Sequence, residues 1–371
     1  MHLLLIHTEA HYFAGAEVLL GHFLHELVKS DCAVSVAMVE GSKIQRIIPQ
    51  GVNRLPVPNN QKFSLKTLHR QVKELLTAHQ KEPFDLVHGW AARDWELTVW
   101  AGTKGRVSTM GTLHDHPEAR FFSLQRRLLM RGCVRWGLNR LVCVSHAVRS
   151  ACIAAGYPAH KLVVVHNGVP TDDEPCSESE SKGVVRLGFL AAFSERKGLR
   201  GLFETVKELE RLCPGAWELF VAGRAQDAEG QTLVDSIRWN YANENWWARV
   251  HWCGWAAEPR RFLDGIDILI CPSSEFEPFG LVLCEAGLAA IPVVAASVGG
   301  IPEIVVDGET GWLFEAGQWK QAASLLARLV RSPELGKTAG IHGAARVSRE
   351  FSIGKMVAGY KKIYSNLLSD V

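Results

Sequence analysis

Short apolar runs alternate with amphipathic helical patterns along most of this chain, and the alternation occurs in two rounds. The apolar runs lie at residues 3–7, 33–39, 85–88, 107–110, 140–144 and 162–165, and then at 184–190, 218–222, 250–253, 268–271 and 293–295. Helical spacing is found at residues 16–29, 199–212, 233–247, 281–290 and 321–330. Strands that alternate with helices form βαβ units and a mostly parallel sheet. The sequence therefore predicts an α/β protein.

A polar segment that contains proline and few apolar residues separates the two rounds at residues 170–183. Such a composition indicates a linker, and 371 residues are enough for two full-sized cores. We predict domains at residues 1–169 and 184–351, with a last helix at 352–371 that packs back on the first domain. Two α/β domains usually hold a ligand in the cleft between them.

Composition narrows the class of protein. The chain is 47% hydrophobic and 22% charged, as is ordinary for a soluble protein, and no run of eighteen apolar residues predicts a membrane span. Residues 3–7 are expected to form a first strand, since the basic region and cleavage site of a signal peptide are missing. Nine cysteines without a CxxC pattern favour reduced thiols, a cytoplasmic protein and no structural zinc.

The net charge of +2 hides an asymmetry between the two halves. Residues 1–168 hold 20 Lys and Arg against 12 Asp and Glu, and the remainder holds 21 against 27. Two basic segments with apolar neighbours lie in the first half, at residues 62–81 (from Lys62 to Lys81) and 120–140 (from Arg120 to Arg140). Basic helices of this kind can lie on an anionic membrane surface, or they can be ordinary surface helices packed on a sheet.

The stretch at residues 267–315 carries the clearest chemical signal. Its first strand ends on Pro272, an acidic loop with Glu277 follows, and a helix opens near Phe279-Gly280. Free backbone N–H groups converge at such a helix start and favour anions. Glu285 follows within an apolar segment of that helix, where a carboxylate is costly unless something hydrogen-bonds it. The stretch therefore predicts a ligand with both phosphate and hydroxyl groups.

Several classes of protein lack their signatures in this chain. GxGxxG after the first strand and GxxxxGK[ST] are missing, which argues against a dinucleotide dehydrogenase and a P-loop NTPase. GxSxG and HExxH are missing as well, which argues against hydrolase chemistry. Nucleic-acid binding is not indicated either, because the sequence shows neither a recognition helix nor an RNP-type strand.

The order of motifs resembles the GT-B fold nucleotide-sugar glycosyltransferases, in particular the large retaining group called family 4, over nearly the whole chain. The motifs that carry the resemblance in the stretch are Glu277-Pro278-Phe279-Gly280-Leu281, Glu285-Ala286, Pro292-Val293-Val294, Gly299-Gly300, Pro302-Glu303 and Gly308-x-x-Gly311. The resemblance implies two Rossmann-like domains whose parallel sheets face each other across a cleft.

On the donor side, the resemblance implies that Glu285 holds the ribose hydroxyls and that Glu277 orients the donor sugar. The backbone around Phe279, Gly280, Leu281 and Val282 is expected to face the diphosphate. A solvent-facing Glu285 is the alternative.

The loop at residues 194–198 looks like the family's phosphate-binding Lys-Gly loop, with Lys197 as its cation. The family's usual arginine, five residues earlier, is Ala192 here, and Arg196 is the candidate replacement. The two cations stand where other enzymes use a metal, so no metal or cofactor is predicted; solvated surface charges are the alternative. Gly223 and Arg224 resemble the loop near the base or ribose.

In the first domain, Gly15 sits where the family has a Gly-rich loop, although the usual first glycine is Ala14. An ordinary tight turn is an equal alternative. His114 follows a strand and looks like the histidine that reaches the donor sugar from this domain, a capped turn histidine being the alternative.

The resemblance implies transfer of a sugar, with UDP as the expected nucleotide, to a hydroxyl of a glycan or lipid-linked acceptor, with retention. The expected setting is cell-surface polysaccharide or lipopolysaccharide synthesis at the inner face of the cytoplasmic membrane. A catalytically weak sugar-nucleotide-binding partner, a nucleotide-sugar epimerase and a phosphorylase stay open as alternatives.

Overall fold

The computed structural model describes residues 1–11, 13–171 and 183–369 and divides the chain into two compact units. The first comprises Met1–Pro170 and Ile353–Val371, and the second comprises Thr171–Ser352. Most of the predicted linker at 170–183 lies outside the described residues. In the part that is described, no helix is both long and apolar enough to cross a membrane.

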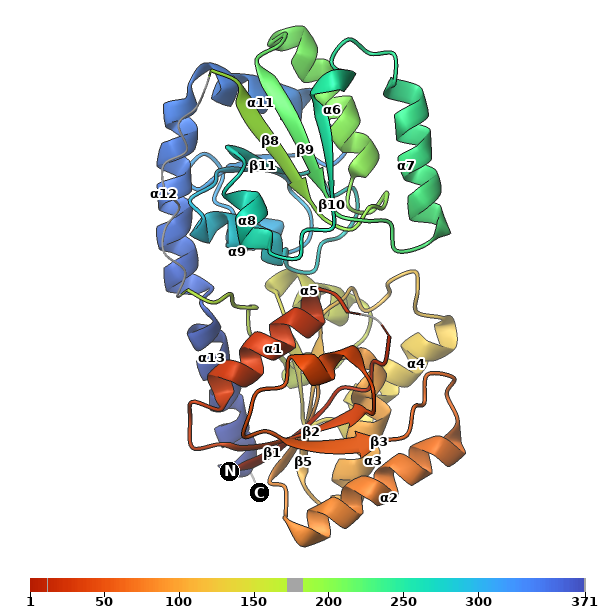
Figure 1. The fold of residues 1–371 in the computed structure, drawn as a ribbon. Coiled ribbons are helices and arrows are strands. Elements are labelled where there is room, and N and C mark those ends of the chain that lie inside the picture. The colour runs from red at the N-terminus through yellow and green to blue at the C-terminus, as the bar shows by residue number, and fades with distance from the viewer. Residues whose placement is uncertain (12, 172–182, 370–371) are drawn as a thin grey trace. The chain divides into compact units, whose positions relative to one another are not determined.

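The first unit contains a seven-stranded parallel sheet in the order β3-β2-β1-β4-β5-β6-β7 (Figure 1). Its strands are β1 (His2–Ile6), β2 (Ala33–Val39), β3 (Asn53–Val57), β4 (Leu86–Gly89), β5 (Ser108–Leu113), β6 (Arg140–Cys143) and β7 (Leu162–Val164). Its α-helices are α1 (Gly15–Leu27), α2 (Leu65–Lys81), α3 (Trp95–Gly105), α4 (Leu124–Gly132), α5 (His146–Ala154) and α13 (Ile353–Ser369). The strand order therefore reverses between β1 and β4: β2 and β3 are added on one side of β1, and β4 to β7 are added on the other.

Helix α13 completes the core of this unit although it comes from the far end of the chain. Tyr364 contributes its hydroxyl to a hydrogen bond of 2.9 Å with Nδ1 of His88, and Nε2 of His88 is 2.8 Å from the Thr112 hydroxyl. Tyr360 also contacts Thr112, at 3.1 Å. All these side chains are fully buried, so their polar atoms need one another as partners.

The second unit contains a six-stranded parallel sheet in the order β10-β9-β8-β11-β12-β13. Its strands are β8 (Val185–Leu190), β9 (Trp217–Ala222), β10 (Val250–Gly254), β11 (Ile268–Cys271), β12 (Val293–Ala296) and β13 (Trp312–Phe314). Its α-helices are α6 (Leu199–Leu212), α7 (Ala228–Tyr241), α8 (Pro259–Leu263), α9 (Leu281–Leu288), α10 (Ile301–Ile304), α11 (Trp319–Arg331) and α12 (Pro333–Glu350). Here the reversal lies between β8 and β11.

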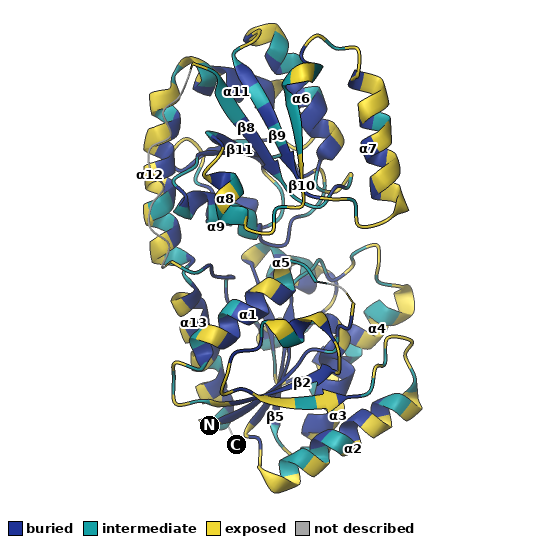
Figure 2. Cartoon of the chain, viewed as in Figure 1, coloured by how far each residue is buried: buried dark blue, intermediate teal, exposed yellow. Residues whose placement is uncertain are grey.

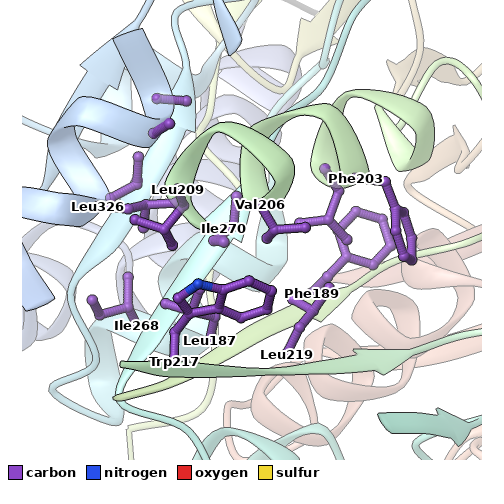
Figure 3. Packing of buried hydrophobic residues seen from close by; sticks show 14 of the residues in the cluster. Leu187, Phe189, Phe203, Val206, Leu209, Trp217, Leu219, Ile268, Ile270 and Leu326 are labelled. Atoms are coloured by element: carbon purple, nitrogen blue, oxygen red, sulfur yellow. The ribbon is translucent and has the colours of Figure 1, made fainter. Parts of the chain in front are cut away.

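The core of the second unit forms where α6 covers the strands. Figure 3 shows Phe203, Val206 and Leu209 of α6 directed toward the strand residues Leu187 and Leu219, all fully buried. Figure 2 shows that the exposed residues gather on the outer faces of α7 and α12. This packing fixes the carboxyl ends of the strands, where the candidate site lies.

The predicted α/β class is confirmed, with two parallel sheets. Two strands escaped prediction: β3 contains Pro56, a residue that weakens a strand pattern and suits an edge, and β13 is only three residues long. The helix predicted at 233–247 lies at Ala228–Tyr241 instead. It begins earlier because Asp227 caps it by accepting a hydrogen bond from the N–H of Gly230 at 2.8 Å.

Candidate functional site

The candidate donor site of the second unit lies where the loops after β8 and β11 meet. The N–H of Ser274, after β11, donates to the Arg196 carbonyl at 3.1 Å, and its hydroxyl donates to the Glu195 carbonyl at 2.5 Å. Open parallel sheets bind ligands outside the carboxyl ends of strands at such a reversal point. The two loops singled out in the sequence are therefore neighbours.

Gly198 allows this close approach. Its φ is +76°, and a Cβ atom at this position would lie 1.7 Å from the Pro272 carbonyl oxygen. Any side chain would overlap with the backbone at the end of β11, and a positive φ already favours glycine. The Lys-Gly pair in the sequence thus reflects a contact between loops as well as the start of α6.

Lys197 and Glu277 are brought together from the two loops. Nζ of Lys197 is 2.5 Å from Oε2 of Glu277, and their side chains are 22% and 9% exposed. An ammonium group has three N–H donors, so this pair leaves Lys197 able to bind another anion. The Glu277 carboxylate therefore holds a cation at the carboxyl ends of β8 and β11.

The backbone of the acidic loop is fixed by the Gly299-Gly300 turn after β12. The N–H of Gly300 donates to the Glu277 carbonyl at 2.8 Å. A Cβ on Gly299, whose φ is +57°, would lie 2.0 Å from that same carbonyl oxygen, and one on Gly300 would lie 2.6 Å from the Pro278 oxygen. Both glycines are therefore required for the position of Glu277.

Glu285 lies in α9, whose first residues follow the acidic loop. Gly280 caps this helix with a φ of +101°, Phe279 before it is buried, and Leu281 and Val282 begin the helix. Burial raises the pKa of Glu285 to about 7. Among the described residues no hydrogen bond or ion pair reaches its carboxylate, so its stabilisation would have to come from a ligand or from water.

The remaining predicted donor-side residues lie at the same edge with different surroundings. Arg196 is exposed beside the Lys197 loop. Gly223 has a φ of +143°, and a Cβ there would lie 1.9 Å from the Ala191 carbonyl oxygen. Backbone packing therefore requires a glycine at this position. Arg224 is exposed, with its guanidinium carbon 4.6 Å from the centre of the Trp255 ring.

In the first unit, a buried charged cluster lies at the reversal between β1 and β4. Nδ1 of His7 hydrogen-bonds Oδ2 of Asp94 at 3.3 Å, and Nε2 is 3.2 Å from Oε1 of Glu17. Burial lowers the pKa of His7, but the hydrogen bonds and charges of Asp94 and Glu17 outweigh it and raise the value to about 9. The cluster is thus a histidinium between two carboxylates.

Gly15 begins α1 beside this cluster and is exposed. The carboxylate of Glu17 accepts from the Ala14 N–H at 2.8 Å and so caps α1 from within the chain. Part of the anion-binding capacity predicted for this helix start is therefore already used by Glu17.

His114 follows β5, and its ring centre is 5.0 Å from that of Trp90. Nε2 of His114 is buried and has no hydrogen-bond partner in the described structure. Burial lowers its pKa to about 4, so the imidazole is neutral near pH 7 and can exchange a hydrogen bond with a hydroxyl. An orphaned buried nitrogen agrees with a ligand contact.

Two family descriptions match the chain in succession. Glycosyltransferase Family 4 matches residues 13–173, and Glycosyl transferases group 1 matches residues 172–345. Together the two matches cover residues 13–345 and identify the chain as a glycosyltransferase of the group 1 and family 4 kind.

Solved and curated relatives agree with this family. Anabaena HepE, solved in complex with UDP and glucose, has a TM-score of 0.83 at 23% identity, covering 98% of this chain and 99% of that one. The likeness shows a shared GT-B fold. The alpha-maltose-1-phosphate synthase of Mycolicibacterium smegmatis is 37% identical over 61% of this chain and 62% of its own. The phosphatidyl-myo-inositol mannosyltransferase of Mycobacterium leprae is 27% identical over 80% and 77%.

The chain spans only 26% to 62% of the length of three curated relatives that it matches. Family membership thus rests on the two family matches, and the specific activity, donor and acceptor are matters of proposal.

Sequence reasoning missed the His7 cluster in this glycosyltransferase. His7 directly follows β1 and Asp94 lies just after β4, so both stand at ends of neighbouring strands. The available signal was the pair of titratable residues after two strands, but without the strand order nothing showed that these ends are adjacent.

Proposed function

We propose that this glycosyltransferase moves a sugar from a nucleotide diphosphate-sugar, with UDP as the nucleotide, to an acceptor hydroxyl with retention at the anomeric carbon. One observation carries the proposal: Lys197 of the loop after β8 forms a 2.5 Å ion pair with Glu277 of the acidic loop after β11. The acidic loop leads into α9, where the Glu285 carboxylate has no partner among the described residues. A cation, a helix start and a free carboxylate together suit phosphate and ribose groups. The UDP bound to HepE supports the choice of nucleotide.

In the proposed donor complex, the Glu285 carboxylate accepts hydrogen bonds from the ribose hydroxyls. The backbone N–H groups at the start of α9, around Phe279 to Val282, face the diphosphate together with the positive end of the helix. Gly223 and Arg224 border the base or ribose, and Gly15 and His114 contact the donor from the first unit. Each assignment follows from the family motifs and from the site residues described above.

In the reaction, the bond between the anomeric carbon and the β-phosphate oxygen breaks, and its electron pair goes to the phosphate. The acceptor oxygen forms the new bond on the same face and gives its proton to the departing phosphate. Lys197, with Arg196, stabilises the negative charge that grows on this phosphate, so that the proposal needs no metal. Electrostatic stabilisation at the place where charge develops is the main contribution of the protein.

Glu277 is proposed to orient the sugar and to position Lys197, and not to act as a nucleophile. Its carboxylate is already paired with an ammonium group at 2.5 Å, which lowers its tendency to attack the anomeric carbon. The two-carboxylate scheme of retaining glycosidases is therefore not applied to Glu277 and Glu285, and front-face attack is preferred.

A panel of nucleotide-sugars measured by thermal shift tests the proposal, because a bound donor raises stability by mass action. We expect UDP and one UDP-sugar to raise the melting temperature, and Glu285→Ala to abolish the rise. Equal shifts for all nucleotides, or an unchanged shift in Glu285→Ala, would contradict the donor assignment.

Ala192 gives a specific reason to keep a second candidate, a sugar-nucleotide-binding protein with weak catalysis. The family arginine is missing at this position, and Arg196 is exposed. Donor binding without turnover over a panel of acceptors would favour this candidate. Conversion of the donor without any acceptor, seen by NMR, would instead indicate an epimerase.

The proposed acceptor is a glycan or a lipid-linked saccharide of cell-surface polysaccharide or lipopolysaccharide synthesis. The net positive first half supports contact with an anionic membrane from its cytoplasmic side, and the basic segments at 62–81 and 120–140 are the two candidate surfaces for this contact.

A further inference from the structure

Helix α4 directs its apolar side chains outward. Leu124 is 70% exposed, Leu128 is 56% exposed and Leu129 is 42% exposed, whereas Met130 is buried. Phe121, just before the helix, is 68% exposed. A helix of a soluble protein normally packs its apolar stripe on the core, so α4 has an apolar face that the first unit leaves uncovered.

The π-helical turn after α4, Cys133–Gly137, continues this face. Trp136 on the turn is 81% exposed. An apolar groove of about 610 Å³ runs between the turn, α4 and α3, with a single polar side chain, that of Gln125, in its lining. The other lining residues are Val99, Leu128, Leu129, Gly132, Cys133, Trp136 and Gly137. A contiguous exposed apolar surface of this kind marks an interaction site.

The turn that presents Trp136 is firmly held. Nζ of Lys161 donates to the carbonyls of Val134, Arg135 and Leu138 at 2.9, 3.1 and 2.7 Å. A Cβ on Gly137 would lie 2.4 Å from the Val99 side chain, so the turn also packs closely on α3. The exposure of Trp136 is therefore a property of an ordered turn.

The segment that carries the apolar face is rich in arginine. Residues 119–140 contain six arginines and no acidic residue. Arg126 pairs with Glu96 and Arg131 pairs with Glu118, while Arg135 is exposed, with its guanidinium carbon 5.8 Å from the Trp136 ring. Arginines beside exposed leucine and tryptophan match the phosphates and acyl chains of an anionic lipid surface.

The other basic segment is built differently. In α2, Leu68, Val72 and Leu75 are buried in the core of the first unit. Only the start of this segment exposes large apolar side chains, Phe63 and Leu65. Two similar sequence patterns therefore differ in burial: most apolar residues of α2 lie in the core, and the leucines of α4 lie at the surface.

We propose that α4 and the Cys133–Gly137 turn insert into the boundary between headgroups and acyl chains of an anionic bilayer. An acyl chain occupies the groove beside Trp136, the exposed Arg135 faces a lipid phosphate, and α2 stays out of the membrane. The inference rests on the proposed function only for the reason to approach a membrane, and it assigns that contact to one surface.

Co-sedimentation with phosphatidylglycerol and phosphatidylcholine vesicles tests the surface. We expect binding to the anionic vesicles at low salt, reduced at high salt, and about tenfold weaker for Leu128→Ser because a leucine side chain no longer leaves water. Leu65→Ser, a leucine of similar exposure on α2, is the matched control and keeps wild-type binding. Equal loss in both variants, no loss in Leu128→Ser, or no vesicle binding by the wild type overturns the proposal.

A second measurement locates Trp136. Brominated acyl chains in the vesicles quench tryptophan fluorescence at contact, and we expect Trp136→Phe to remove this quenching while the variant still binds. Quenching that persists in Trp136→Phe contradicts insertion of the turn. The thermal shift caused by UDP separates the two proposals: its absence in the wild type overturns the donor assignment and leaves the vesicle result standing, whereas its presence in Leu128→Ser shows that the fold and the donor site are intact.

Discussion

Replacement of His7 with glutamine tests the buried charges at the end of the first sheet. His7 is 1% exposed and lies between the carboxylates of Asp94 and Glu17, which are also buried. Glutamine keeps the approximate size and one hydrogen-bond donor but removes the positive charge. Two carboxylates then share a buried site without a cation, a situation that costs several kcal/mol in folded proteins.

The magnitude follows from the pKa of His7. Burial alone would lower it, but the hydrogen bonds and charges of Asp94 and Glu17 raise it from 6.5 to about 9. A rise of this size corresponds to about 3 kcal/mol of stability for the protonated form. Because the folded-state pKa is the higher one, this stability is fully present below pH 6.5 and is lost as the pH rises through 9.

We therefore expect His7→Gln to lower the free energy of unfolding of the first unit by about 3 kcal/mol at pH 6. The wild type should lose stability between pH 6.5 and 9.5, and the variant should lose much less. Hydrogen exchange at increasing urea, read by mass spectrometry on peptides from β1 and α1, resolves the first unit from the second.

His69→Gln is the matched control, since His69 is an exposed histidine on α2 of the same unit. It should leave both the stability and its pH dependence unchanged. The argument fails if His7→Gln retains the wild-type slope between pH 6.5 and 9.5, or if its stability at pH 6 equals that of the wild type.

Three further predictions concern the second unit. Lys197→Ala should reduce turnover by about 100-fold, whereas Lys320→Ala, which replaces an exposed lysine on α11, should leave turnover unchanged. Equal steady-state rates for Lys197→Ala and the wild type would remove Lys197 from the site. Because burial raises the pKa of Glu285 to about 7 and ribose hydroxyls need an ionised acceptor, UDP affinity measured by calorimetry should fall about tenfold from pH 8 to pH 6, and a flat profile would contradict this role. Gly198→Ala, whose Cβ would lie 1.7 Å from the Pro272 oxygen, should destabilise the unit by about 2 kcal/mol or more in urea unfolding; an unchanged midpoint would refute the close approach.

Much of the fold was predictable because strands and helices differ in the period of their apolar residues. The strand at Ile268–Cys271 and the helix at Leu199–Leu212 match their predictions residue for residue. The prediction missed β3 because Pro56 weakens its strand pattern, and it placed the start of α7 too late because the cap at Asp227 was overlooked. The roles of the donor-side residues stay predictions until the variants above are measured.

The sequence by itself determined two parallel α/β sheets and the motif residues of the candidate donor loops, because period, turn residues and motif spacing are local properties. It could not determine contacts between segments far apart in the chain. The Lys197–Glu277 pair joins residues 80 positions apart, and the His7–Asp94 pair joins residues 87 apart. Nor could it distinguish α2 from α4, whose patterns are similar. Only the tertiary structure decided that the leucines of α2 enter the core and those of α4 stay outside, because burial depends on which neighbour covers each helix face.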